Sequence, residues 1–133
     1  MVKIYRILLN WLPPLIWMVI IFYFSSRLSA SVTGEFLYDF IFFKGLHMIE
    51  YAILYFLLFR AFYTINSSQL SINKKLFFPL ILSVFYALSD EIHQTFVPTR
   101  EGKIRDVFID TAGILIMYIY IKNNIDIVKK FLK

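Results

Sequence analysis

Cysteine is absent from this chain of 133 residues. Its absence excludes disulfide bonds, thiolate metal ligands and a cysteine nucleophile. Glycine is scarce, with four residues, and no Gly-rich loop of the kind that cradles phosphate is present. No low-complexity run or internal repeat divides the chain, so we expect one domain over residues 1–133.

Apolar residues are abundant instead. The chain is 59% hydrophobic and 20% aromatic, with a mean hydropathy of +0.68, which is too apolar for a soluble domain of this size. Four stretches, 7–24, 43–62, 76–96 and 107–121, approach the ~20 residues that a spanning helix needs. The connections leave no room for a soluble domain. We predict an all-α, polytopic membrane protein built as a bundle of four transmembrane helices.

The first apolar stretch follows Lys3 and Arg6, as in a signal peptide. It is longer than a typical h-region of ~7–15 residues, and the sequence Ser29-Ala30-Ser31 is only a weak cleavage site. We therefore expect a retained helix.

Basic residues are distributed unequally between the two ends of the predicted helices. With four spans, both termini lie on one side, together with the connection between the second and third helices. That side carries Lys3, Arg6, Arg60, Lys74, Lys75, Lys122, Lys129, Lys130 and Lys133. The other side carries Arg27, Lys44, Arg100, Lys103 and Arg105. The positive-inside rule then predicts cytoplasmic termini in a multi-pass protein.

The net charge of +5 does not indicate nucleic-acid binding, because basic residues at helix ends serve orientation and lipid contact. We expect membrane lipids as partners and no nucleic acid. The oligomeric state does not follow from the sequence.

Ionisable residues recur inside the apolar stretches, where each costs several kcal/mol unless it is paired or hydrated. At about 100° per residue, one face of the second stretch carries Lys44, His47, Glu50 and Tyr51. One face of the third carries Asp90, His93 and Gln94, whereas Glu91 points about 100° away, toward either the same site or an interface. In the predicted topology all of them lie near the outer leaflet.

The fourth stretch carries Asp106, Asp110 and Gly113 in a narrow line. Gly113 is small enough to let another backbone approach. Two acids one turn apart repel each other unless a cation is near.

The charges of this region do not balance. Five acids, Glu50, Asp90, Glu91, Asp106 and Asp110, face three cations, Lys44, Arg100 and Arg105, which leaves an excess of two negative charges. A proton on a carboxylate would offset the excess, and so would a divalent metal ion held by His and carboxylate ligands. The cofactor stays open between these alternatives.

The segment Lys-Gly-Leu-His-Met-Ile-Glu-Tyr, from Lys44 to Tyr51, resembles the Lys-x-x-His-x-x-x-Tyr signature of the VanZ-like family of bacterial membrane proteins. A second block is similar to three further family motifs. Asp90-Glu91-Ile92-His93-Gln94 matches Asp-Glu-x-x-Gln, and Pro98-Thr99-Arg100 matches Pro-x-Arg. Asp106 with Asp110-Thr111-Ala112-Gly113 is similar to Asp-x-x-x-Asn-x-x-Gly. Phe24-Ser25-Ser26 also matches, with Arg27 where the family often has Gln. Asp110 departs from the pattern, because many members carry Asn there.

The resemblance implies a small helical protein of the bacterial cytoplasmic membrane, in a family whose founding member is linked to teicoplanin resistance. It supplies no settled reaction. Our first hypothesis is action at the outer face on an anionic amphiphile, either a lipid-linked cell-envelope precursor or a glycopeptide antibiotic such as teicoplanin, with an antibiotic-resistance role. Lys44 and Arg100 would hold the anion while the acids orient them.

Two alternatives stay open. A metal-assisted hydrolase or transferase of lipid phosphates would use Asp90, Glu91, His47 and Asp106 as catalytic residues; whether the chain is an enzyme is undecided. A structural scaffold or small transporter would use the charges for packing or proton passage. In the first two cases the ligand-binding residues are Lys44, Glu50, Tyr51, His93, Gln94, Arg100 and Asp110. Ser25 and Ser26 are expected to cap the first helix rather than to react.

Overall fold

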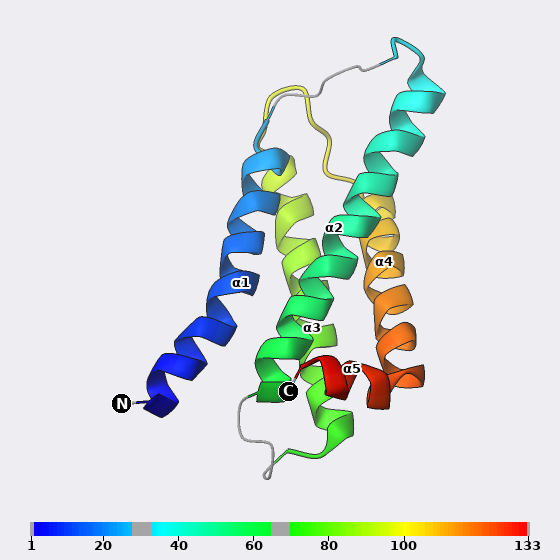
Figure 1. Cartoon of the computed structure of the whole chain (residues 1–133). Helices are drawn as coiled ribbons and strands as arrows, with labels where there is room; N and C mark the ends of the chain where they lie inside the picture. The colour runs from blue at the N-terminus through cyan, green and yellow to red at the C-terminus, as the bar shows by residue number, and fades with distance from the viewer. Residues whose placement is uncertain (1, 28–32, 65–69, 133) are drawn as a thin grey trace.

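A computed structural model describes residues 2–27, 33–64 and 70–132, and all regular structure in these ranges is helical. Four long helices run side by side, α1 (Val2–Ser25), α2 (Phe36–Thr64), α3 (Ile72–Gln94) and α4 (Ile104–Asn123), and a short helix, α5 (Ile125–Phe131), closes the chain (Figure 1). The predicted all-α fold is therefore confirmed.

The helices begin earlier in the chain than the predicted stretches, and the third also ends earlier. The second helix begins at Phe36 rather than at 43, and the third covers 72–94 rather than 76–96. The short helix α5 was not predicted, because its seven residues are too few and too charged to give an apolar pattern. Ser29-Ala30-Ser31 and the side chains of Lys3 and Arg6 lie outside the described part of the chain.

Within the described ranges, three helices are long and apolar enough to cross a membrane: residues Ile7–Ser25 of α1, all of α2 and all of α3. Only 11% of the most apolar window of α1 is buried inside the protein, so most of this helix presents apolar side chains outward. Such a surface is stable in lipid and unstable in water. Helix α4 is not among these three, because Arg105, Asp106, Asp110 and Lys122 interrupt its apolar sequence. It lies beside α2 (Figure 1).

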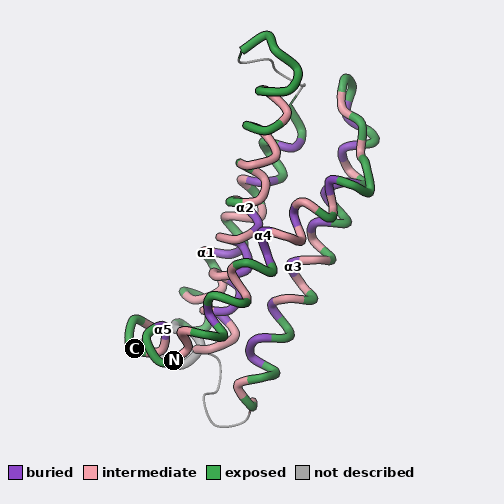
Figure 2. The backbone as a smooth tube through the Cα atoms, turned by 90° about the vertical axis from the view of Figure 1, so that its right-hand side faces the viewer, coloured by how far each residue is buried: buried purple, intermediate pink, exposed green. Residues whose placement is uncertain are grey.

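The interior is organised around α2, which packs against α1, α3 and α4. Tyr51, Tyr55 and Phe59 of α2 are fully buried, and Ile21 of α1 and Ile114 of α4 meet them. Figure 2 shows the buried positions recurring along the helices at intervals, with exposed positions between them. This spacing follows from the helical period of 3.6 residues, which returns every third or fourth side chain to the inner face.

The two ends of the bundle differ in their connections. Both chain ends lie at one end of the bundle (Figure 1). The other end gathers the end of α1, the start of α2 and the connection between α3 and α4. Helix α2 has 29 residues. At 1.5 Å per residue it is about 43 Å long, more than the ~30 Å hydrocarbon thickness of a bilayer, and its first turns project beyond its neighbours (Figure 1).

Helices α2 and α4 approach each other closely at Gly113. A Cβ atom at this position would collide with the backbone carbonyl of Met48 in α2. The predicted role of Gly113 in admitting a second backbone is thus confirmed.

We predict that Gly113→Ala separates α2 from α4 and destabilises the protein by roughly 1–3 kcal/mol, the usual cost of overpacking. Equilibrium unfolding in mixed micelles would measure the change. Gly45→Ala is the matched control, because a Cβ at Gly45 meets no described atom within 4 Å. If both variants have the same free energy of unfolding as the wild type, the close approach of α2 and α4 does not contribute to stability.

Candidate functional site

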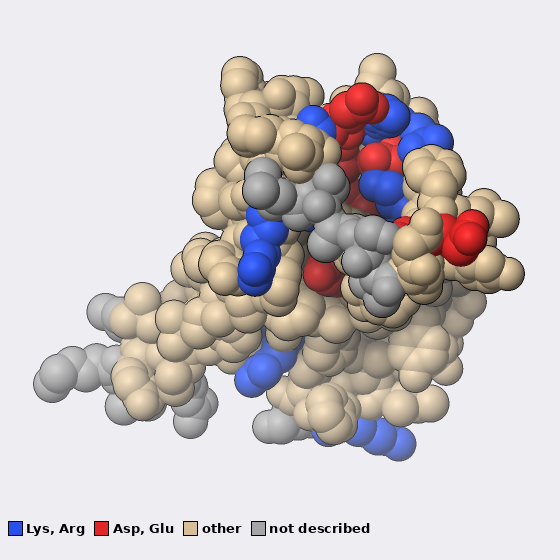
Figure 3. All heavy atoms as spheres, turned by 90° about the horizontal axis from the view of Figure 1, so that it is seen from above, with Lys and Arg blue, Asp and Glu red and all other residues tan. Residues whose placement is uncertain are grey.

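Acidic side chains concentrate at the end of the bundle opposite the chain ends, and several basic side chains lie among them (Figure 3). Seen along the bundle from that end, they surround a hollow, whereas most of the remaining surface is uncharged (Figure 3). The acids are Glu50 of α2, Asp90 and Glu91 of α3, and Asp106 and Asp110 of α4, which we call the carboxylate cluster. Four of its members are at most 5% exposed, and only Glu50 is half-buried.

An ion pair between α2 and α4 lies in this cluster. Lys44 Nζ donates to Asp106 Oδ2 at 2.5 Å, and the Lys44 side chain is 19% exposed. The other oxygen of Asp106 accepts from Arg105 Nε at 3.3 Å, while the Arg105 guanidinium lies 4.7 Å from the ring centroid of Phe40. One carboxylate thus binds two cations from different helices.

His47 lies one turn deeper in α2 and faces two acids. Its Nδ1 atom is 3.8 Å from Asp110 Oδ1 and 3.9 Å from Glu50 Oε2. Both distances are longer than a hydrogen bond, so no directed bond joins His47 to either acid. The backbone oxygen of Glu50 accepts from Trp17 Nε1 at 2.8 Å, which joins this part of α2 to α1.

Asp90 joins α3 to α1. Its Oδ2 atom accepts from Ser25 Oγ at 2.7 Å and from Gln94 Nε2 at 3.1 Å. The expectation that Ser25 caps the first helix is wrong, because its buried hydroxyl is directed into the bundle. Ser26 does make the expected cap, since its Oγ donates to the carbonyl of Phe22 at 2.7 Å.

Glu91 points toward the connection between α3 and α4. Its Oε2 atom accepts from the backbone N–H of Lys103 at 3.1 Å. A Cβ at Gly102 would collide with the carbonyl of Glu91 and with Thr95. Glu91 therefore fixes the start of α4 against the end of α3 from inside the protein.

Arg100 bonds to the end of α1. Its Nε donates to the carbonyl of Arg27 at 2.9 Å and its Nη2 to that of Phe24 at 3.3 Å. Phe24 lies in the last turn of α1 and Arg27 just beyond it. The last four carbonyls of a helix lack intrahelical donors, so Arg100 supplies donors where the helix ends. His93 contacts the same end of α1, with Nε2 3.0 Å from Ser26 Oγ and its ring on Phe22 at 4.4 Å.

Several buried polar atoms of this end have no hydrogen-bond partner among the described residues. They are His47 Nδ1, Tyr51 Oη, Asp90 Oδ1, Glu91 Oε1 and both carboxylate oxygens of Asp110. Unpaired buried polar groups are rare and costly, and each needs a physical explanation. The atoms come from α2, α3 and α4, the three helices that carry the cluster. The lack of hydrogen-bond partners is therefore shared by the whole cluster.

The cluster does not assemble a metal site by itself. Within the described ranges, no three His, Asp or Glu side chains are placed to hold one ion. Three acids, Glu91, Asp90 and Asp106, lie close enough to Asp110 to repel its negative charge, and Lys44 lies close enough to attract it. Their arrangement suits proton sharing and the binding of cationic or hydrogen-bonding groups.

The apolar exterior, the helical bundle and the buried carboxylate cluster define a small helical membrane protein with a polar site at one end. A model of the VanZ/LLP1 family matches residues 10–128, and the chain belongs to this family. No curated protein and no solved structure matches the chain significantly.

The residues singled out from sequence thus meet in space, but three of their partners were missed. The missed donors are the hydroxyl of Ser25, the indole N–H of Trp17 and the backbone N–H of Lys103. Only Ser25 carried a signal, its place in the Phe24-Ser25-Ser26 motif. The functional roles assigned to the candidate residues stay predictions.

We predict that Lys44 and Asp106 are energetically coupled. Asp106→Leu should destabilise the protein by leaving Lys44 without its partner, and Lys44→Met by leaving Asp106 only the exposed Arg105; the double variant should recover part of the loss. A double-mutant cycle of unfolding free energies should give a coupling of roughly 0.5–3 kcal/mol.

The control is Lys103→Met with Glu101→Leu, which removes an exposed pair at 2.6 Å. Exposed pairs contribute about 0–1 kcal/mol. Strictly additive effects at Lys44 and Asp106 would contradict the coupling.

Proposed function

We propose that this protein acts at the outer face of the cytoplasmic membrane on an amphiphile with an anionic head group. The observation that carries the proposal is the set of exposed basic side chains at the rim of the carboxylate cluster, beside an apolar exterior. An amphiphile has the matching distribution, with a charged head beside apolar chains. In the proposed orientation the site would lie at the depth of the head group of a lipid-embedded ligand.

The rim cations are the groups best placed to meet the anion. Arg105 is 58% exposed and Lys103 is 49% exposed at the side chain, and Arg27 is also exposed. Arg100 has five N–H donors and uses two of its nitrogens on α1. Guanidinium groups bind phosphate and carboxylate bidentately, which favours Arg100 and Arg105 over the lysines as the main contacts.

Lys44 has a different part in this proposal. It is bonded to Asp106 below the rim, so it offsets one negative charge of the cluster, while Arg100 and Arg105 keep further N–H donors for the ligand. The unpaired atoms of Asp110, Asp90 and Glu91 would accept from hydroxyl, amide or ammonium groups of the same ligand. Lipid-linked cell-envelope precursors and glycopeptide antibiotics such as teicoplanin carry both anionic and donor groups. Membership of the VanZ/LLP1 family supports this class of ligand and an antibiotic-resistance role.

The proposal includes four spanning helices with both chain ends in the cytoplasm. Helix α4 would be the fourth span, with its acids covered by α2 and α3 rather than exposed to lipid. The basic residues near the chain ends support this orientation.

Single cysteines test the topology, because the chain has none of its own. We expect Glu101→Cys to react with a membrane-impermeant maleimide in intact cells. Asn73→Cys, which is equally exposed but lies at the opposite end, should react only after permeabilisation. The reverse pattern would place the carboxylate cluster on the cytoplasmic side and would overturn the proposed outer-face function.

Ligand binding tests the site itself. We expect polyprenyl diphosphate or teicoplanin to bind the wild type in nanodiscs of phosphatidylcholine. The double variant Arg100→Gln, Arg105→Gln should bind at least about tenfold more weakly, because it loses charge-assisted contacts. Lys74→Gln removes an exposed positive charge at the opposite end and should bind like the wild type. Unchanged binding in the double variant, with a retained melting temperature, would refute the assignment of the anion to the rim arginines.

A second candidate function is hydrolysis or group transfer at the phosphate of such an amphiphile. The placement of His47 between Glu50 and Asp110 favours it, because a histidine flanked by carboxylates suits general acid–base catalysis. A divalent ion would have to complete its coordination with ligand phosphate oxygens. Mass spectrometry of the amphiphile recovered from the binding experiment distinguishes the two functions, since only an enzyme returns an altered molecule.

A further inference from the structure

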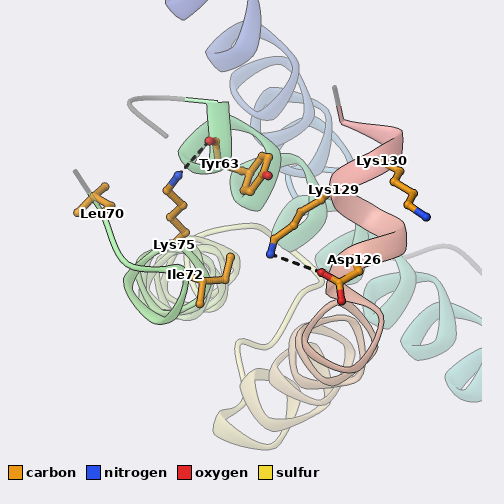
Figure 4. A pocket seen from close by; sticks show the side chains of 7 residues that line it. All are labelled: Tyr63, Leu70, Ile72, Lys75, Asp126, Lys129 and Lys130. Atoms are coloured by element: carbon orange, nitrogen blue, oxygen red, sulfur yellow. Dashed lines mark hydrogen bonds and ion pairs between the residues drawn. The ribbon is translucent and has the colours of Figure 1, made fainter. Parts of the chain in front are cut away.

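A second polar cavity lies at the other end of the bundle, near the chain ends. It has a volume of about 560 Å³ and is formed where α5 folds back beneath α2 and α3. Its lining residues are Tyr63, Leu70, Ile72, Lys75, Asp126, Lys129 and Lys130 (Figure 4). The volume falls within the range of small-molecule sites, about 300–1,000 Å³.

Lys75 is the unusual member of this cavity. It is only 3% exposed, and lysine is almost never buried without a partner of opposite charge. Its ammonium group donates to the carbonyl of Tyr63 at 3.4 Å and lies 5.0 Å from the centroid of the Tyr63 ring. No carboxylate forms an ion pair with it among the described residues. The Lys75 ammonium has three N–H donors, and one long hydrogen bond with one ring contact does not satisfy all of them.

The rest of the lining increases the positive charge. Lys129 and Lys130 border the same cavity, and Lys129 is close enough to Lys75 for the two charges to repel. Asp126 is the single acid of the lining; it contacts Lys129 at 3.7 Å while its side chain is 89% exposed (Figure 4). Three lysines and one acid leave an excess of two positive charges in the lining, although the Lys130 ammonium points away from Lys75 and Lys129 (Figure 4).

We propose that this cavity binds a phosphate group. Several lysine ammonium groups around a cavity suit an oxyanion, and a phosphate would give Lys75 the partner that the protein does not supply. The cavity lies at the end where α2 finishes and α3 begins, beside the apolar residues Leu70 and Ile72, which are compatible with the glycerol region of a lipid. The phosphate would belong to an anionic lipid of that leaflet or to a soluble phosphate compound. This proposal is independent of the proposed function, because the two sites lie at opposite ends of the bundle.

The test uses the full chain purified in a neutral detergent. Native mass spectrometry with phosphatidylglycerol, in an excess of phosphatidylcholine, should show one retained phosphatidylglycerol on the wild type. In Lys75→Gln its dissociation constant should rise about tenfold. Lys129→Gln, which changes a partly exposed residue and leaves the buried position intact, should give a smaller loss in the same direction.

Lys74→Gln is the matched control, since Lys74 is the neighbouring residue of α3 and does not line this cavity. Arg105→Gln, at the opposite end, should retain phosphatidylglycerol, which separates this site from the amphiphile site. A parallel measurement by equilibrium dialysis uses radiolabelled inorganic phosphate without lipid. Binding of phosphate that depends on Lys75 would identify a soluble source. The proposal is overturned if neither probe binds, or if Lys74→Gln weakens binding as much as Lys75→Gln.

Discussion

The ion pair between Lys44 and Asp106 sets the arrangement of the site. Isolated charges in a lipid-embedded bundle cost several kcal/mol, so two helices that each carry one are driven to bring them together. Once Asp106 lies against Lys44, helical spacing brings Asp110 toward His47 one turn deeper and Gly113 to the backbone of Met48 one turn deeper again. The height of α4 beside α2 is thereby defined, and with it the position of every acid in the cluster.

The remaining acids tie the other helices to this pair. Asp90 holds α1 through Ser25, and Glu91 holds the connection to α4 through the N–H of Lys103. Each structural bond uses one carboxylate oxygen and leaves the second oxygen unpaired and buried. The same residues therefore fix the fold and present acceptors toward the interior, which explains why structural and functional roles coincide at these positions.

Helical periodicity was enough to predict much of this. It placed Lys44 and His47 on one face and Asp106, Asp110 and Gly113 on another, because within a helix the spacing of residues determines their direction. Periodicity carries no information about rotation or height between helices, so the bonds of Ser25 to Asp90 and of Arg100 to the carbonyls of α1 were not foreseen. Periodicity leaves the direction of Glu91 open for the same reason, and the backbone donor of Lys103 has no signature in sequence.

The separation of charge along the bundle has an electrical consequence. Acids are concentrated within one end, whereas Lys75, Lys122, Lys129 and Lys130 lie at or near the other. A protein with this polarity has a dipole along its long axis. An energised membrane with a negative interior acts on such a dipole with about 2.3 kcal/mol per elementary charge for each 100 mV. The membrane potential would therefore draw the lysine-rich end inward and resist inversion of the bundle, in addition to any selection made during insertion.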